Sequence, residues 1–481
     1  MNLKQKALNG VKWTSISSVI IAMLQLVQVA ILTRYLDPSD FGLMAIVSVV
    51  IGFSALFMDM GISSAIIHKQ DITKAQLSSL YWLNIFAGTI LFFIVYFSAS
   101  MVSQYYDESQ IIPLIQLLAL TFFISAIGNQ YRILNQKNLL FNRLAKVEVI
   151  SAFISFIVAV VCAANGYGVY SLVYATLTNV SVSNLIFMLQ GLKEHKPSLV
   201  YKHNEIKSLI GFGLFQMGER TINYFNSQFD VILIGKLLGT EALGIYNVAK
   251  IFVMKPAQII NPVITKVTFP IMSTIQSDTK QLKNIYLKTI NYLCSVNFPI
   301  YMAIAILSEP LVLVLFGDKW HESIAIMQIL ALYFIFRSIG NPIGSLQLAK
   351  GRADLGFYWN LGLLLLIPIV IYVGSFYGLI GIALSLLGLQ VFLNVPNWYF
   401  MVRPLCEAGF YEYFKQIFIP MITAVIASIF GFMAYYFIPV NDLYIRSLIF
   451  LSLASLAYLF LLKLYNNNLY SLLLSTLKRK G

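Results

Sequence analysis

Seven polar or charged side chains recur at helical spacing inside one long apolar stretch, residues 213–235 (GLFQMGERTINYFNSQFDVILIG). On an α-helix, which turns about 100° per residue, they fall within one arc of about 120°. At 1.5 Å per residue they climb about 21 Å, most of the hydrocarbon thickness of a bilayer. Polar and charged groups in such a row should face something wet along its length and not lipid. We call this set the polar stripe: Gln216, Glu219, Arg220, Asn223, Asn226, Ser227 and Asp230.

The composition shows what kind of element must position the stripe. Of the 481 residues 59% are hydrophobic and 11% charged, whereas about 25% are charged in soluble proteins. Apolar runs of about 20 residues, enough to cross a bilayer as helix, recur along the whole chain. We therefore predict an all-α integral membrane protein with fourteen transmembrane spans, at 11–33, 41–67, 77–103, 111–131, 147–165, 168–191, 208–235, 241–265, 289–308, 323–348, 355–375, 378–402, 411–437 and 443–462.

The positions of the basic residues predict the orientation. With a cytoplasmic amino terminus, most of the 33 Lys and Arg fall in cytoplasmic segments, and only Arg34, Lys236, Lys319 and Arg446 lie on the outer side. Because short cytoplasmic loops are enriched in Lys and Arg, we expect both termini in the cytoplasm. The net charge of +13 is then explained by the anionic inner leaflet, and no nucleic-acid partner is predicted.

The sequence lacks the usual marks of an enzyme. It has no G-x-x-x-x-G-K-[ST] phosphate loop, and its four histidines fall in predicted loops. The three cysteines, Cys162, Cys294 and Cys406, are widely spaced in or beside apolar spans, which favours neither a disulfide framework nor a metal site. The basic start resembles a signal peptide, but no cleavage site follows, so it should remain as the first span. We expect no catalytic residue, no metal and no cofactor.

Two halves of the chain repeat each other. A shift of 202 places residues 34–42 on 236–244, and a shift of 212 places QLLALTFFISAIGN (116–129) on QILALYFIFRSIGN (328–341), with most positions identical. Each repeat then holds six helices, an even number, so the two are parallel and related by an axis along the membrane normal. We predict an N-lobe at 1–200, a C-lobe at 201–405, and two further spans with a basic tail at 406–481, with the basic segment 192–207 as a flexible connection between the lobes.

The same shift of 202 extends the candidate site. It pairs Gln25 with Ser227 and Gln28 with Asp230, so the first span carries a weaker polar face that matches the stripe. Six ionisable groups within the spans would each cost about 3 kcal/mol in lipid, so they should face a hydrated central cavity or one another. The six are Asp59, Glu219, Arg220, Asp230, Lys250 and Arg337, and Asn247 lies one turn from Lys250. Pairing between helices is the structural alternative for each single residue.

Four stretches of the sequence carry a resemblance to a known family. The run LTRYLDPSDFGLMAIV (32–47), followed by DMGISSA (59–65), resembles the polysaccharide-biosynthesis flippases of the multidrug/oligosaccharidyl-lipid/polysaccharide (MOP) exporter superfamily. Residues 116–129 and the turn GYGVYSL (166–172) look most like the colanic-acid-exporter type of O-antigen and capsule flippase. Taken by itself, Asp37-Pro38-Ser39-Asp40 reads as a turn and helix start, with Asp40 capping the second span.

The resemblance implies a function in the bacterial plasma membrane. It implies movement of an undecaprenyl-pyrophosphate-linked oligosaccharide to the outer leaflet by alternating access, in association with polysaccharide polymerase and export machinery. We expect three cations to attract the pyrophosphate and the amides to contact sugar. The cations are Arg220, Lys250 and Arg337, and the amides are Gln216, Asn223, Asn226, Asn247, Gln25 and Gln28. Asp59, Glu219 and Asp230 are candidates for proton coupling or for charge balance.

Three other functions remain open. An ion-coupled drug exporter of the same fold would need an acidic, aromatic-lined pocket, which the mixed charges and amides of the stripe do not favour. A membrane glycan polymerase or ligase would need a large outer loop, and the longest predicted one, around Glu309–Glu322, holds little more than a dozen residues. A passive lipid scramblase is neither favoured nor excluded by charges within the spans.

Overall fold

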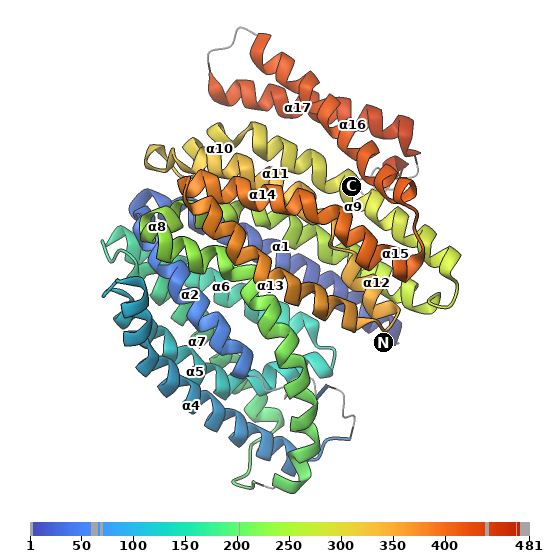
Figure 1. The fold of residues 1–481 in the computed structure, drawn as a ribbon. Helices are drawn as coiled ribbons and strands as arrows, with labels where there is room; N and C mark the ends of the chain where they lie inside the picture. The colour runs from blue at the N-terminus through green and yellow to red at the C-terminus, as the bar shows by residue number, and fades with distance from the viewer. Residues whose placement is uncertain are drawn as a thin grey trace. The chain divides into compact units, whose positions relative to one another are not determined.

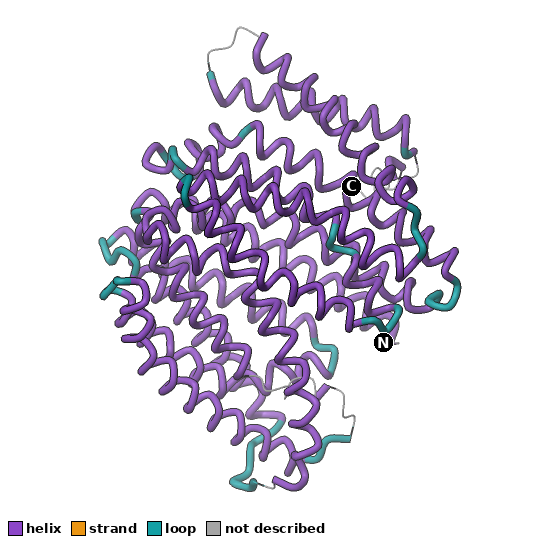
Figure 2. The backbone as a smooth tube through the Cα atoms, viewed as in Figure 1, coloured by secondary structure: helices purple, strands orange, loops and turns teal. Residues whose placement is uncertain are grey.

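The computed structural model of the chain describes residues 3–58, 66–67, 71–201, 203–437, 442–467 and 469–471. Inside these ranges the side chains of residues 3–9, 11, 194, 203–217, 219, 263, 266–267 and 434 are not described. All regular secondary structure in the described part is helical (Figure 2). Thirteen helical segments there are long and apolar enough to cross a membrane, which confirms the predicted all-α membrane class.

The chain divides into two compact units, Met1–Asn247 with Leu363–Pro368, and Val248–Gly362 with Ile369–Gly481. In the first unit α5 packs against α4 and α7, α6 packs against α7 and α1, and α2 packs against α4 and α5 (Figure 1). The lobe boundaries predicted from the repeat stay a prediction. The helices that begin in this unit are α1 (Leu3–Tyr35), α2 (Pro38–Met58), α4 (Lys74–Tyr106), α5 (Ile111–Lys137), α6 (Phe141–Ala164), α7 (Tyr170–Glu194) and α8 (His203–Thr274).

One helix accounts for two predicted spans. The apolar segment Arg220–Pro262 is 43 residues long, about twice what a bilayer requires. Inside it Gly239 has φ 84° and ψ 179°, which interrupts the helix, and glycine tolerates this conformation because it has no Cβ. The segment therefore corresponds to two predicted spans, so the thirteen segments found among the described residues account for the fourteen predicted ones.

In the second unit α9 is the central helix, since it packs against both α11 and α16. Helix α14 packs on α11, and α17 packs on α16. The elements of this unit are α9 (Thr279–Ile306), α10 (Ser308–Leu315), a 3-10 turn (Asp318–Trp320), α11 (Ser323–Ile339), α12 (Ile343–Ala349), α13 (Ala353–Ser375), α14 (Gly378–Asn397), a π-helical turn (Trp398–Val402), α15 (Arg403–Cys406), α16 (Phe410–Phe437) and α17 (Leu443–Tyr465).

Helix starts follow local sequence signals. Helix α2 begins at Pro38, within the predicted turn, so Asp40 lies in its first turn and is not the N-cap that the sequence predicted. The Asp40 carboxylate instead accepts a hydrogen bond from the Asp37 N–H at 3.1 Å. Thr73 and Gln76 form a capping box at the start of α4, which satisfies two N–H groups that the first turn leaves open. The predicted span 323–348 corresponds to the apolar segment Ser323–Ala349, within which a turn that contains Pro342 separates α11 from α12. Proline favours such a break because it lacks an N–H.

The repeat-related segments 34–42 and 236–244 contact each other. A Cβ on Gly42 would lie 1.8 Å from the Thr240 carbonyl oxygen, and a Cβ on Gly244 would lie 1.7 Å from that of Pro38. The repeat pairs Gly42 with Gly244. Gly42 packs on the backbone four residues before Gly244, and Gly244 packs on the backbone four residues before Gly42. The contact is reciprocal, as expected for two segments that are related by a two-fold axis.

The basic segment after α7 is attached to α4. Ser198 accepts a hydrogen bond at its carbonyl from Trp82 Nε1 (2.9 Å), and its N–H donates to Ser78 Oγ (3.1 Å). The Tyr131 hydroxyl donates to the carbonyl of His195 (3.3 Å). Charge and length alone predicted a flexible connection here, but these contacts hold residues 195–198 against the first unit.

Candidate functional site

The polar stripe lies on the first half of α8. Arg220 and Asn223 are exposed, whereas Asn226, Ser227 and Asp230 are half-buried. The side chains of Gln216 and Glu219 lie outside the described residues. The described part of the stripe therefore presents a guanidinium and amides on one face of a helix that crosses the membrane.

Aromatic contacts fix the orientation of α8 in the first unit. The Tyr224 hydroxyl donates to the carbonyl of Val49 at 2.8 Å. It lies over Gly52, where an added Cβ would come within 2.5 Å of the phenol oxygen. Phe225, which helical geometry places opposite the stripe, packs against Phe53 with ring centroids 5.2 Å apart. The aromatic side of α8 thus binds α2 and leaves the stripe on a different face.

Asp230 connects the two halves of α8. The hydroxyl of buried Tyr246 donates to Asp230 Oδ2 at 2.8 Å, and Val231 N–H donates to Oδ1 at 2.9 Å. The phenol comes from beyond the break at Gly239, so the carboxylate stabilises the packing of one span on the next. Ser227 is used locally, since its hydroxyl donates to the carbonyl of Tyr224 at 2.8 Å. A coupling role of Asp230 stays a prediction.

The other candidates in the first unit lie on α1 and α8. Gln25 is exposed and Gln28 is half-buried on α1, and Asn247 is half-buried on α8. Asp59 lies outside the described residues.

In the second unit Lys250 is half-buried, and exposed Arg337 donates from Nη1 to the Tyr333 hydroxyl at 2.6 Å. Asn261, which the repeat pairs with Asp59, accepts a hydrogen bond from Asn297 (3.1 Å) and is buried. The candidate residues belong to both units, so their meeting in one central cavity stays a prediction.

A polar cavity that the sequence reasoning missed lies within the first unit. Its volume is about 280 Å³, and Ile21 of α1 and the buried ring of Phe187 contribute apolar wall. We call it the polar pocket. The signal in the sequence is the spacing i, i+4, i+7 on α5 and i, i+4 on α7, which places these residues on single helix faces. Its polar lining includes Ser125, Asn129 and Arg132 from α5, Glu148 from α6, and Asn179 and Ser183 from α7.

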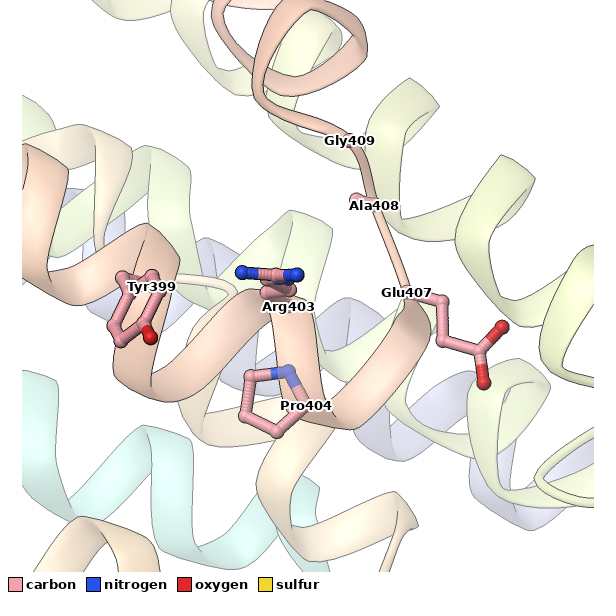
Figure 3. Close-up of a pocket in the computed structure, with 6 residues that line it drawn as sticks. All are labelled: Tyr399, Arg403, Pro404, Glu407, Ala408 and Gly409. Atoms are coloured by element: carbon pink, nitrogen blue, oxygen red, sulfur yellow. The ribbon is translucent and has the colours of Figure 1, made fainter.

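A second cavity, of about 630 Å³, lies in the second unit where α15 leads into α16 (Figure 3). The Arg403 guanidinium lies 5.6 Å from the Tyr399 ring centroid and 6.0 Å from that of Trp398. In Figure 3 the Glu407 carboxylate points away from Arg403. An arginine beside aromatic rings at the end of a span is typical of the membrane–water interface, so this arrangement indicates an anchor at the bilayer surface.

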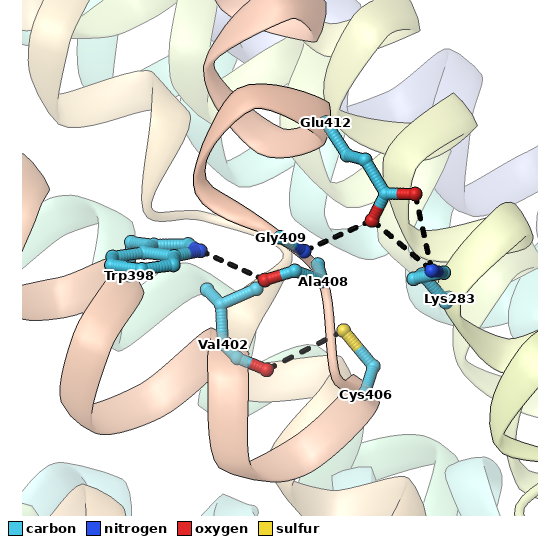
Figure 4. Close-up of polar contacts among 7 residues, drawn as sticks. All are labelled: Lys283, Trp398, Val402, Cys406, Ala408, Gly409 and Glu412. Atoms are coloured by element: carbon cyan, nitrogen blue, oxygen red, sulfur yellow. Dashed lines mark hydrogen bonds and ion pairs between the residues drawn. The ribbon is translucent and has the colours of Figure 1, made fainter.

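Hydrogen bonds hold the connection beside this second cavity (Figure 4). Trp398 Nε1 donates to the carbonyl of Ala408 at 3.0 Å, and Gly409 N–H donates to Glu412 Oε2 at 2.9 Å. Lys283 of α9 forms an ion pair with the same carboxylate at 3.1 Å. The last two helices are thereby attached to α9 at a defined point.

The fold matches those of solved membrane transporters. The lipid II flippase MurJ, in an inward closed conformation, gives a TM-score of 0.76 over 95% of this chain and 99% of that chain, at 15% identity. An inward-facing multidrug resistance transporter of the MATE family and MOP superfamily gives 0.63 over 81% and 98%, also at 15% identity. At such identities the likeness shows the fold alone, and that fold is the one of MOP-superfamily transporters.

Sequence similarity is more specific than the fold. The sequence model of the family described as "Polysaccharide biosynthesis protein" matches residues 31–325. Lipopolysaccharide biosynthesis protein WzxC of Escherichia coli (strain K12) is 31% identical over 421 residues, which cover 87% of this chain and 86% of that protein. Teichuronic acid biosynthesis protein TuaB of Bacillus subtilis (strain 168) is 32% identical over 434 residues, 90% of this chain and 89% of that one. The chain belongs to this polysaccharide biosynthesis family, which confirms the resemblance.

Proposed function

We propose that the protein moves an oligosaccharide repeat unit, linked to undecaprenyl pyrophosphate, from the cytoplasmic to the outer leaflet for assembly of a surface polysaccharide. The observation that carries the proposal is the stripe on α8, where Arg220, Asn223 and Asn226 share one face inside a span. Moving a sugar chain through hydrocarbon requires protein groups that replace its water. Two similar proteins are named for surface polymers, and the fold is also that of a lipid II flippase.

Each part of such a substrate has a chemical counterpart among the candidates. Guanidinium and ammonium groups bind phosphate oxygens, so Arg220, Lys250 and Arg337 attract the pyrophosphate. The amides of the stripe and of α1 contact sugar hydroxyls, and the prenyl tail stays in lipid. Transport proceeds by rocking of the two lobes in the plasma membrane with both termini cytoplasmic, and Asp59, Glu219 and Asp230 are the carboxylates that could couple it to protons.

Deletion of the gene tests the proposal in a strain that makes the polysaccharide. We expect lipid-linked repeat units to accumulate on the cytoplasmic side, because later steps act on the outer face. Undiminished surface polysaccharide would contradict any role in export. Monomeric units at the outer face without polymer would instead indicate a polymerase.

Complementation with Arg220→Ala tests the site itself. We expect surface polysaccharide to fall on the order of 100-fold, since truncating a charge that contacts an ionic ligand costs several kcal/mol. Arg220→Lys should restore part of the export because it keeps the charge. Lys236→Ala is the matched control, because Lys236 forms an ion pair with Asp107 at 2.9 Å away from the stripe. Full export by a normally inserted Arg220→Ala protein would exclude this residue from the site.

A further inference from the structure

The polar pocket is built into the packing of one unit. A Cβ on Gly128 of α5 would lie 2.5 Å from the Asn184 carbonyl oxygen of α7, so the absence of a side chain lets the two helices touch. Ser155 of α6 donates a hydrogen bond of 2.7 Å to the carbonyl of Ala175 of α7. These contacts lie within about a turn of the cavity and fix its walls. The pocket is therefore a preformed cavity among α1, α5, α6 and α7.

Several polar groups in the pocket have no hydrogen-bond partner within the described part of the chain. Among the residues that the structure describes, the side chains of Ser125, Asn129 and Asn179 form no hydrogen bond. Asn184 uses only its Nδ2, which donates to the carbonyl of Val180 at 2.8 Å. Polar groups at membrane depth need partners from a ligand or from water. The volume of about 280 Å³ corresponds to roughly nine water molecules.

The charges in the pocket cancel each other. Arg132 Nη2 lies 3.6 Å from Glu148 Oε1, and the two side chains remain 55% and 36% exposed. Glu148 disfavours a phosphate group beside the guanidinium, and Arg132 disfavours a metal cation beside the carboxylate. A guanidinium, a carboxylate, amides and hydroxyls together offer both donors and acceptors. This set matches a neutral molecule with several hydroxyl groups.

The ion pair lies near one end of the pocket, and the pocket's volume limits the size of a ligand. Residues 138–140 connect the end of α5 to the start of α6. Arg132 lies five residues before the end of α5, and Glu148 lies seven residues after the start of α6. Asn129 and Ser125 lie about 5 and 10 Å deeper along α5. In the predicted orientation the ion pair is on the cytoplasmic side. A pocket near the lower end of the usual range of about 300–1,000 Å³ holds one or two sugar rings rather than a complete repeat unit.

We propose that the polar pocket is a binding site for a neutral sugar residue, in which Asn129 and Asn179 contact hydroxyl groups and the Arg132–Glu148 pair lines the cytoplasmic entrance. The inference rests on the proposed function, because a sugar is at hand only if the substrate is a lipid-linked glycan. It assigns sugar recognition to a single lobe, at a place separate from the polar stripe.

The test compares two probes on the purified full-length protein in nanodiscs. One probe is the undecaprenyl-pyrophosphate-linked repeat unit extracted from the producing strain, and the other is undecaprenyl pyrophosphate without sugar. The double variant Asn129→Leu/Asn179→Leu keeps side-chain volume and removes the amides, and Gln136→Leu, exposed on α5 outside the pocket, is the matched control. Native mass spectrometry gives the affinities, and thermal unfolding confirms that each variant is folded.

We expect the wild type to prefer the glycosylated probe. The double variant should bind it about tenfold more weakly, as two lost hydrogen bonds predict, and should bind the bare lipid as the wild type does. Arg220→Ala should weaken both probes, and Gln136→Leu neither. An unchanged preference in the double variant, or an equal loss for both probes, would overturn the pocket as a sugar site and leave the flippase proposal standing. Failure of the wild type to bind either probe would overturn both.

If the double variant does not fold, Ser183→Leu replaces it. This change places an apolar side chain in the same cavity. The Ser183 hydroxyl of the wild type donates to the carbonyl of Val180 at 3.1 Å within α7, so the change removes only a local hydrogen bond. Loss of preference for the glycosylated probe is again expected. An unaltered preference in this variant would count against the proposal.

Discussion

The clearest repeat in the sequence, residues 116–129 and 328–341, adopts two different structures. The first copy lies within one continuous helix, α5, of 27 residues. The second ends α11 at Ile339, and α12 begins at Ile343. The shift of 212 places Gln130 on Pro342, directly after the matching segment. The helix break in the second copy therefore coincides with a proline at the position where the first copy has glutamine.

Equivalent positions of the repeat also have different neighbours in the two copies. Gly128 is pressed against the α7 backbone, whereas a Cβ on its partner Gly340 would lie no closer than 3.4 Å to Asn397 Nδ2. Ser125 lines the polar pocket, whereas its partner Arg337 bonds to Tyr333. Arg132 is matched by Gly344, so the ion pair of the pocket is absent from the second copy. Both copies are helical, but they carry different polar groups.

Making the first copy resemble the second should have the largest effect. Gln130→Pro removes a helix hydrogen bond and introduces a steric clash, which costs about 3 kcal/mol or more in a helix interior. It also removes the bond from Gln130 Nε2 to the Leu77 carbonyl (3.0 Å), which joins α5 to α4. We expect little monodisperse protein in fluorescence-detected gel filtration.

The reciprocal change is the control for Gln130→Pro. Pro342 is buried, so Pro342→Gln brings an amide into packed surroundings at a cost of about 1–3 kcal/mol. It breaks no backbone hydrogen bond, because proline donates none, and it should therefore cost less than Gln130→Pro. Equal yields of the two variants would show that the break at Pro342 does not distinguish the copies.

Substitution of the paired glycines should have an intermediate effect. Gly128→Ala forces α5 and α7 apart, and overpacking of this kind costs about 1–3 kcal/mol, which exceeds the gain of up to about 1 kcal/mol from placing alanine in a helix. Gly340→Ala meets only ordinary contacts and should leave the melting temperature nearly unchanged. Thermal unfolding in detergent measures both, and equal melting temperatures would contradict the close contact of α5 with α7.

The comparison also shows what the sequence could reveal. Hydrophobic run length located most spans, and the turn at Asp37–Asp40 located the start of α2, because both depend on local chemistry. The polar pocket was missed because its residues come from four helices, and only their packing makes one cavity of scattered Ser, Asn and Arg. The tyrosine bond to Asp230 was missed for the same reason, since Tyr246 approaches it from across the break at Gly239.

Replacing Arg337, the basic residue that the second copy has and the first lacks, should have the smallest effect on stability. Arg337→Ser gives the second copy the residue of the first, and because Arg337 is exposed the change in unfolding free energy should stay within about 0.5 kcal/mol. If this guanidinium attracts the pyrophosphate, export should still fall about tenfold. Tyr333→Phe, which removes only the 2.6 Å hydrogen bond to Arg337, should reduce export less, because the charge remains. Surface polysaccharide and melting temperature are measured on the same variants. Full export by Arg337→Ser would assign the arginine to packing at the end of α11 and leave Arg220 and Lys250 as the proposed anion contacts.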